Sequence, residues 1–190
     1  AKVVTGNSAP QDRNLFVDGK YPFFRTSDAA VISKNVNLIH SADLLNEDGI
    51  KVYGQGNVIK DDFTLGHRHI PIERFESDFT QYEIYEGDVL ITMMGTTGKS
   101  KVFKQSYKRG ILDSHLLRLR FKKTSFISHL FVTILQESNY VFTQLKLTSK
   151  GSIMEGLNSS IVKELTLMTP PISEQQQIVA SANTTTSNVT

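Results

Sequence analysis

The clearest helical pattern in the chain follows Thr124 and Ser125. Apolar residues recur there at the spacing i, i+3, i+4, i+7 and i+8, namely Ile127, Leu130, Phe131, Ile134 and Leu135. This period puts their side chains on one face of a helix. The face continues less regularly through Val141, Phe142 and Leu145. We therefore expect one long helix here, with its apolar face packed on the protein core.

Short strand patterns fill the part of the chain before this helix. The apolar run 88–94 lies between Gly87 and Gly95, has no helical period and predicts a buried strand. In the segment 115–121, alternate residues point to opposite sides, with Leu117, Leu119 and Phe121 on one side and Leu116, Arg118 and Arg120 on the other. Further strands are predicted at 15–17, 21–25, 50–53, 57–59 and 101–103, and Asp18-Gly19 is typical of a hairpin turn between the first two.

The order of these elements predicts the fold class. Strands come first and helices late, a short helix is expected near 159–163, and there is no regular alternation of strand and helix. This order favours a mixed α+β domain with a mostly antiparallel sheet and packed helices. The chain has no internal repeat, so we expect one module and not two.

The double proline at 170–171 ends the helix or strand that precedes it, because neither proline has a backbone N–H to donate. Ser173 is a good N-cap, Gln176 stands in the capping-box position and Glu174 suits the helix dipole. A helix is therefore predicted from about Ser173. The polar and β-branched residues 181–190 predict that it hardly continues. We place a domain at 1–168 and a linker with a truncated helix start at 169–190.

Composition agrees with one compact domain. The chain has 190 residues, 39% of them hydrophobic, which is enough for a single core. The first ten residues lack the features of a targeting segment, and no apolar run approaches the length needed to span a membrane. The absence of cysteine excludes disulfides and thiolate metal sites. We expect a cytoplasmic protein, and the missing initial methionine suggests a processed or excised fragment.

The net charge of +2 is small, but the charges are unevenly distributed. The segment 73–88 holds six acids and one base, whereas 99–123 holds nine bases and one acid, Asp113. Such asymmetry can place a positive field on one side of the fold, as a phosphate-binding surface requires. The alternative is ordinary solvated surface charge.

The segment 93–100, MMGTTGKS, resembles half of a P-loop. Its spacing is wrong, because the first glycine would belong at Met93. The residues that follow are basic and broken by Gly110, so the helix that a P-loop requires is not expected. We predict a tight glycine turn between two strands, with Thr96 and Thr97 at its tip beside Lys99 and Lys101. A P-loop nucleotide-binding enzyme stays open as an alternative.

Other catalytic signatures are incomplete. Residues 169–172, TPPI, resemble the loop of amino-methyltransferases but lack its amide or acid and its aromatic residue. Residues 18–20, DGK, lack a suitably spaced second carboxylate for a nuclease. His67 and His69 would share a face on a strand, as metal ligands could, but only Glu73 and Glu76 stand near as further ligands. We expect no catalytic site, no cofactor and no bound metal.

Several ordered blocks together resemble a known family. They are VVTGNSAP with YPFFRTSDAA near the start, EGDVLITMMGTTGKSKVF in the middle, ILDSHLLRLRF after it, and LNSSIVKELTL followed by PPISEQQQIV at the end. In this order, the blocks are similar to a target-recognition domain in the DNA-specificity subunits of type I restriction-modification systems. The resemblance covers nearly the whole chain. No single block is very specific, so the evidence for the resemblance is the presence of all the blocks in the family's order.

The resemblance implies a non-catalytic, sequence-specific DNA-binding role. In the family, two recognition domains separated by long spacer helices each read half of a bipartite target. The partner methyltransferase subunits bind S-adenosylmethionine, and the restriction or motor subunit binds ATP. We therefore expect double-stranded DNA, these subunits and a second copy or second recognition domain as partners. A purely structural assembly module that does not bind DNA is the other alternative.

The resemblance also suggests roles for individual residues. Candidates for phosphate contacts surround the glycine turn: Thr96, Thr97, Lys99, Lys101, Lys104 and Arg109. Arg68, His67 and His69 are candidates for base readout, because arginine can chelate guanine and histidine can donate or accept.

Two further groups belong to the matching blocks. Ser114 and His115 stand where the family has a polar pair before a strand, although its usual amide variant is absent here. Arg25, Thr26 and Ser27 either contact DNA or cap a turn at Asp28.

Overall fold

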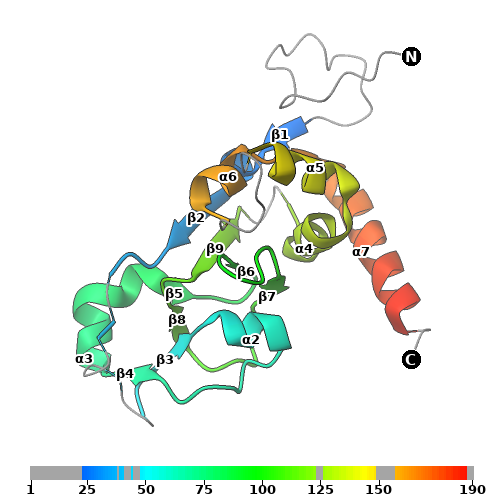
Figure 1. Cartoon of the computed structure of the whole chain (residues 1–190). Coiled ribbons are helices and arrows are strands. Elements are labelled where there is room, and N and C mark those ends of the chain that lie inside the picture. Colours follow the sequence, from blue (N-terminus) through cyan, green and yellow to red (C-terminus); the bar gives the residue numbers. More distant parts are fainter. Residues whose placement is uncertain are drawn as a thin grey trace, which may run out of the picture.

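A computed structural model of the chain describes residues 23–37, 39–40, 44, 48–122, 126–148 and 157–187 (Figure 1). The predicted strand 15–17 and the hairpin turn at Asp18-Gly19 lie outside these residues. In chain order the elements are β1 (Phe23–Arg25), α1 (Thr26–Ala29), β2 (Ala30–Lys34), β3 (Ile50–Tyr53), α2 (Gln55–Lys60), β4 (His69–Ile70), α3 (Ile72–Arg74), the π-helical η3 (Phe75–Phe79), the 3₁₀ turn η4 (Thr80–Tyr82), β5 (Glu83–Ile84), β6 (Val89–Thr92), β7 (Ser100–Val102), β8 (Gly110–Leu112), β9 (Leu116–Phe121), α4 (Ser128–Glu137), α5 (Asn139–Thr148), α6 (Ser159–Glu164), β10 (Thr166–Met168) and α7 (Ile172–Ser187).

The strands of the described residues form three sheets. One has the order β2-β9-β6-β7, a second has the order β4-β3-β8-β5, and β1 pairs with β10. Every neighbouring pair is antiparallel except β3 with β8, which is parallel. The predicted fold class, a mixed α+β domain with mostly antiparallel sheets and packed helices, is therefore confirmed.

The strands β6 and β9 lie between two hydrophobic cores. On one side, Leu90 and Leu116 join the cluster that we call the sheet core, which also contains Tyr53 and Phe63. On the other side, alternate residues of the same strands join the cluster that we call the helix core, namely Val89, Ile91, Leu117 and Leu119. The buried strand predicted at 88–94 and the alternation predicted at 115–121 are both confirmed.

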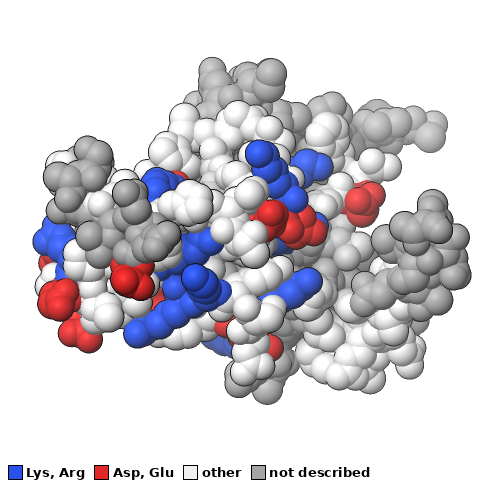
Figure 2. All heavy atoms as spheres, turned by 90° about the horizontal axis from the view of Figure 1, so that it is seen from below, with Lys and Arg blue, Asp and Glu red and all other residues white. Residues whose placement is uncertain are grey.

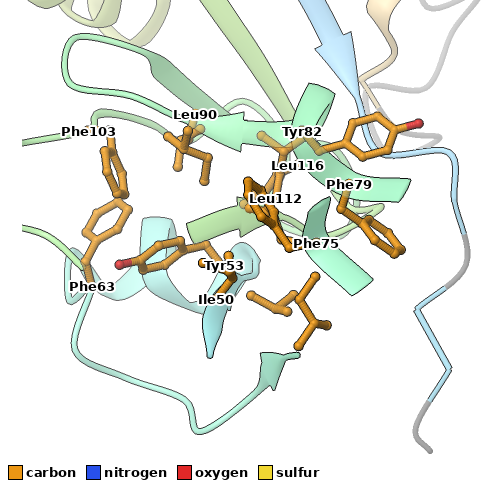
Figure 3. Packing of buried hydrophobic residues seen from close by; sticks show 14 of the residues in the cluster. Ile50, Tyr53, Phe63, Phe75, Phe79, Tyr82, Leu90, Phe103, Leu112 and Leu116 are labelled. Atoms are coloured by element: carbon orange, nitrogen blue, oxygen red, sulfur yellow. The ribbon is translucent and has the colours of Figure 1, made fainter. Parts of the chain in front are cut away.

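The sheet core is rich in aromatic rings (Figure 3). Tyr53, Phe63 and Phe103 contact one another in tilted or edge-on pairs with centroids 5.3 to 5.7 Å apart. Such pairs stabilise a core beyond their buried area. The Tyr53 hydroxyl donates to the Lys108 carbonyl at 2.7 Å, and burial raises the pKa of Tyr53 to about 12. This bond ties the loop before β8 to β3.

The helix core is covered by α4, α5, α6 and the start of α7, which lie at the top and right of Figure 1. The single long helix predicted after Ser125 is wrong, because the chain forms two helices that meet at Ser138. The backbone of Ser138 is extended, with φ −83° and ψ 115°, and its hydroxyl oxygen accepts from the Val141 N–H at 3.4 Å. The less regular spacing after residue 135 was the sequence signal of this break.

The strand predicted at 57–59 is also wrong, since these residues belong to α2. The Asn57 side chain stabilises both ends of this short helix. Its oxygen accepts from the N–H of Gly54, just before the helix, at 3.0 Å, and its amide donates to the carbonyls of Asp62 and Leu65, after the helix. The helix ends where Asp61 adopts the left-handed conformation, with φ 54°. Side-chain bonds to the backbone therefore override the apolar pattern here.

The helix predicted from about Ser173 begins at Ile172 as α7, so its start is confirmed to within one residue. The expectation that it hardly continues is wrong, because α7 runs to Ser187. Once a helix has begun, each further residue adds a hydrogen bond, and polar residues weaken it by only a few tenths of a kcal/mol. The start is anchored by the buried Gln175, which accepts from the Ile127 N–H and donates to the Pro170 carbonyl, both at 2.9 Å.

Gly110 gives a test of the close approach between β3 and β8. A Cβ at this position would lie 2.5 Å from a ring carbon of Tyr53 and 2.6 Å from the Lys51 carbonyl oxygen. We expect Gly110→Ala to lower the free energy of unfolding by about 3 kcal/mol in urea titrations, because backbone must shift. Gly56→Ala is the matched control, since a Cβ there meets nothing within 4 Å. Equal stability of the two variants would contradict this packing.

Candidate nucleic-acid interface

Three segments meet at the N-terminal end of α2. The Gln55 side-chain oxygen accepts from the backbone N–H groups of Met93 and Met94, both at 3.0 Å. The Met93 N–H also lies 3.1 Å from the carbonyl oxygen of His115. Gln55 therefore joins the start of α2 to the turn after β6 and to the turn before β9.

The turn between β6 and β7 is a tight glycine turn, as predicted. Gly95 and Gly98 have φ values of 64° and 78°, which favour glycine. The Thr92 hydroxyl oxygen accepts from the Lys99 N–H at 3.1 Å, and this closes the base of the turn. The P-loop alternative is wrong, because the residues after Lys99 form the antiparallel strand β7 and not a helix.

The candidate phosphate-binding residues of this turn differ in their surroundings. Thr96 and Lys99 are exposed, and Thr97 is half-buried. The Lys101 ammonium lies 2.7 Å from a carboxylate oxygen of Asp61, at the end of α2. Because both partners are exposed, this pair adds little stability. It does offset the charge of Lys101, so Lys99 is the better candidate for a phosphate contact.

Arg68 is held by an acid that lies far away in the sequence. Its guanidinium nitrogen Nη2 lies 3.0 Å from Asp113 Oδ2, and the side chains are 46% and 12% exposed. The other Asp113 oxygen accepts from the His115 N–H at 2.9 Å. A Cβ on Gly54 would lie 2.8 Å from Arg68 Nη2 and 2.9 Å from Asp113 Oδ2. Glycine at position 54 therefore makes room for this ion pair.

The Arg68–Asp113 pair lies at a pocket of about 450 Å³ beside α2, whose lining includes Gly54, Gly56 and Lys60. Sequence reasoning missed both Asp113 and Lys60 as members of this site. The signal for Asp113 was present, since it is the single acid within the basic segment 99–123. Half-exposed Arg68, fixed by a buried carboxylate, can present its remaining N–H groups to a planar acceptor.

Ser114 and His115 lie next to this pair, in the turn between β8 and β9. Both are exposed, and the Ser114 hydroxyl lies 3.4 Å from His115 Nδ1. Their backbone is fixed by Asp113 and by the contact with Met93. The structure thus brings Ser114, His115, Arg68 and the glycine turn together around the start of α2.

His67 and His69 line a different pocket, of about 550 Å³, together with Lys51, Tyr107 and Lys108. As expected for an extended segment, the two histidines share a side and Arg68 lies on the other. Within the described residues, no group of three or more His, Cys, Asp or Glu side chains is placed to hold a metal ion. Base readout by Arg68 and by the histidines would therefore have to occur in separate pockets.

Arg109 and Lys104 lie outside this cluster. The Arg109 guanidinium is 2.5 Å from a carboxylate oxygen of Glu83 and stacks over the Phe75 ring at 4.7 Å. The Lys104 ammonium lies 6.0 Å from the centre of the Tyr107 ring and is exposed. Arg109 is therefore a partner of β5, and its charge is offset there.

The strand β1, which ends at Arg25, lies at the helix-core end of the molecule, whereas α2 lies at the other end (Figure 1). The Arg25 guanidinium is 3.6 Å from Glu164, and the Arg25 N–H donates to Asp28 at 3.2 Å. The buried Thr26 hydroxyl donates to the Leu165 carbonyl at 3.1 Å. These contacts favour the second interpretation of this block, in which its side chains stabilise a turn. The structure does not bring Arg25 or Ser27 near the other candidate DNA-binding residues.

The two oppositely charged segments of the sequence pair with each other across the fold. Arg109 bonds to Glu83, and Arg120 holds Asp88 through two hydrogen bonds of 2.7 and 2.8 Å. Acids of the segment 73–88 therefore offset part of the positive charge of the segment 99–123. Seen from below, Lys and Arg side chains lie across the left and middle of the face, and Asp and Glu side chains lie at its left end and also among them in the middle (Figure 2).

The family model described as the type I restriction modification DNA specificity domain matches residues 1–184. The chain belongs to this family. DNA target recognition is the general role of these specificity domains, so the resemblance found in the sequence is confirmed. No curated protein matches the chain in sequence.

Solved structures show the same fold as this specificity domain. One, described as the structural basis of complex assembly and conformational transition of the type I R-M system, is 17% identical, with a TM-score of 0.66 over 89% of this chain and 39% of that chain. The HsdS subunit of Thermoanaerobacter tengcongensis is 18% identical, with a TM-score of 0.63 over 91% and 39%. The S subunit of M. genitalium is 9% identical, with a TM-score of 0.52 over 88% and 40%.

The specificity domain thus spans about two fifths of the length of these structures. Among its described residues, no helix is both long and apolar enough to cross a membrane.

Glu83 gives a test of the charge pairing in the specificity domain. Burial acts to raise the pKa of its carboxyl, but hydrogen bonds from Arg109 and the Tyr85 hydroxyl outweigh this and hold the pKa below its usual value. The folded state therefore favours the carboxylate, so this stability is present above the unfolded pKa of about 4.3 and is lost as the pH falls through the lower folded value.

We expect the unfolding midpoint of the wild type to fall steeply below about pH 4.3, the ordinary glutamate pKa, and that of Glu83→Gln to fall less steeply. Thermal unfolding followed by circular dichroism between neutral and acidic pH measures this. Glu86→Gln is the control, because Glu86 is exposed on the following loop. If Glu83→Gln and Glu86→Gln show the same pH profile, the pairing with Arg109 does not stabilise the fold.

Proposed function

We propose that this specificity domain reads one half of a bipartite target in double-stranded DNA and that it directs methyltransferase and restriction subunits to that target without a catalytic role of its own. The family supports DNA recognition. The observation that carries the proposal is the half-exposed Arg68, held by buried Asp113 beside the glycine turn and the start of α2.

Arg68 has the properties of a base-reading side chain. An arginine can donate two parallel hydrogen bonds to O6 and N7 of guanine in the major groove. Bonding of one nitrogen to Asp113 fixes the guanidinium before DNA arrives, so less side-chain freedom is lost on binding. The two glycines beside it, Gly54 and Gly56, place no side chain between α2 and an approaching duplex.

The glycine turn suits contacts with the DNA backbone. Exposed Thr96 and Lys99, with Thr97 beside them, offer hydroxyl, amide and ammonium donors at one protruding turn. Such contacts fix the register of a protein on DNA but carry no sequence information. Ser114 and His115, next to Arg68, are further candidates for contacts with DNA.

The division of the chain also belongs to this proposal. Residues 1–168 are the recognition domain, and 169–190 are a linker with the first part of a spacer helix. Gln175 ties the first turn of α7 into the helix core, so the helix would leave the domain in a fixed direction. A second recognition domain or a second copy, held through this helix, would read the other half-site and raise the affinity for the whole target.

The proposed partners follow from the structural likeness. One matching structure is described as a type I R-M system in complex assembly, and we extend this to assembly of the present chain with methyltransferase and restriction subunits. The alternative is an assembly module that does not contact DNA.

Lys99→Ala tests the backbone contact. We expect random duplex DNA to bind the wild type weakly and in a strongly salt-dependent way, and Lys99→Ala to reduce the slope of log K against log salt by about 1 for all sequences alike. Fluorescence anisotropy at several salt concentrations measures this slope. Lys163→Ala, on α6, removes the same charge far from α2 and should leave the slope unchanged. Absence of any salt-dependent binding by the wild type would favour the assembly alternative.

Arg68→Ala tests base readout. We expect the variant to lose about 1–3 kcal/mol of discrimination at one base pair while still binding random DNA. Sequences selected from a randomised duplex pool by the wild type and by the variant would show the lost preference. Arg25→Ala is the matched control, because β1, which ends at Arg25, lies at the opposite end of the fold from α2 (Figure 1). A uniform loss of affinity for every sequence would rule out base readout by Arg68.

A further inference from the structure

A second pocket lies on the other side of the loop that carries Arg68. Its volume is about 550 Å³, and its lining includes Lys51, His67, His69, Ser106 and Lys108. Gly66 is shared by both pockets, so the backbone of this loop separates them. The aromatic wall is formed by Phe63 and Tyr107, which stack on each other at 4.3 Å with nearly parallel rings.

Lys51 is a buried lysine in this pocket, and its ammonium is held in place by hydrogen bonds. The residue is 4% exposed, and its ammonium donates to the carbonyls of Phe63 and Thr64, both at 2.9 Å. An ammonium has three N–H donors, and these two carbonyls use two of them. The same ammonium lies 5.3 Å from the centre of the Tyr53 ring. Carbonyl oxygens orient the ammonium without neutralising its charge.

The charges around the pocket are unbalanced toward positive. Lys51 and Lys108 line it together with two histidines, whereas Asp48 is its one acidic lining residue. Burial, and then repulsion from Lys108, lower the pKa of Lys51, while nearby Asp62 acts in the opposite direction. Two cationic side chains that line one pocket favour an anion as its ligand.

We propose that this pocket binds a phosphate group. Phosphate oxygens can accept several hydrogen bonds at once, and the lining offers ammonium, imidazole and Ser106 hydroxyl donors. The cationic lining disfavours a metal ion. The mutual stacking of Phe63 and Tyr107 leaves no pair of open rings to hold a base between them. The phosphate group could belong to the DNA backbone or to a free phosphate compound.

Inorganic phosphate is the direct probe. The chain has five histidines, so the imidazole signals can be followed one by one in NMR spectra and assigned with His67→Gln and His69→Gln. We expect phosphate, exchanged for chloride at constant ionic strength, to shift the His67 and His69 signals in a saturable way. The signal of His129, exposed on α4, should stay unchanged. Absence of a saturable shift of His67 and His69 would overturn the proposal.

Lys108→Ala tests the cationic lining without removing the support that Lys51 gives to its loop. The Lys108 carbonyl, which accepts from Tyr53, is kept in this variant. We expect the affinity for phosphate to fall about tenfold, as for a lost hydrogen bond between charged groups. Lys163→Ala is the charge-matched control and should bind phosphate like the wild type. Equal affinities of Lys108→Ala and the wild type would also overturn the proposal.

A third measurement identifies the source of the phosphate group. If it belongs to the DNA backbone, a short duplex will compete with inorganic phosphate and lower its apparent affinity for the pocket, and Lys108→Ala will weaken binding to all duplexes. If it belongs to a free compound, phosphate and DNA will bind together without competition. The phosphate titration contains no DNA, so failure of DNA binding and failure of this pocket are separate results.

Discussion

The fold depends on a buried ionic contact between the two sheets. Asp88, at the start of β6, is 1% exposed and accepts two hydrogen bonds from Arg120, while Arg118 of β9 is 5% exposed and donates to the Glu83 carbonyl. These arginines project from β9 toward the sheet core, where an unpaired charge would be costly. Removal of Arg120 would leave the buried Asp88 carboxylate without these two hydrogen bonds and would therefore destabilise the fold. The same contact joins β5 to β6 and β9, and so places one sheet against the other.

This arrangement leaves the candidate DNA interface on connections and not on strands. The start of α2, the glycine turn after β6 and the turn after β8 each lie at the end of a buried strand. Gln55 links the first two by hydrogen bonds, and the contact of the Met93 N–H with the His115 carbonyl links the third. Rigid strands thus hold short loops in fixed positions, as is common for binding sites. Arg68 is oriented by Asp113, and Gly54 leaves the space that this ion pair needs.

Local patterns predicted the elements whose partners lie in the hydrophobic cores. The run 88–94 contains β6, and the alternating segment 115–121 contains β9. Both were predictable because the pattern of apolar residues in the sequence indicates which side chains of a strand are buried. The glycine turn and the start of α7 were predicted for similar local reasons. Two of the errors fall where single polar side chains decide the backbone conformation. Asn57 turned a predicted strand into α2, and Ser138 divided a predicted helix into two.

The sequence by itself determined the family, the mixed α+β class and the positions of β1, β3, β6, β7 and β9, since these follow from ordered motifs and side-chain periodicity. Only the tertiary structure decided which charges are available to a ligand. Arg109, Arg118 and Arg120 are equivalent to Lys99 in a count of bases, but they pair with acids from an earlier segment. Arg68 meets Asp113 across 45 residues of sequence. A charge acts according to its neighbours in space, and those neighbours are brought together by packing between distant segments.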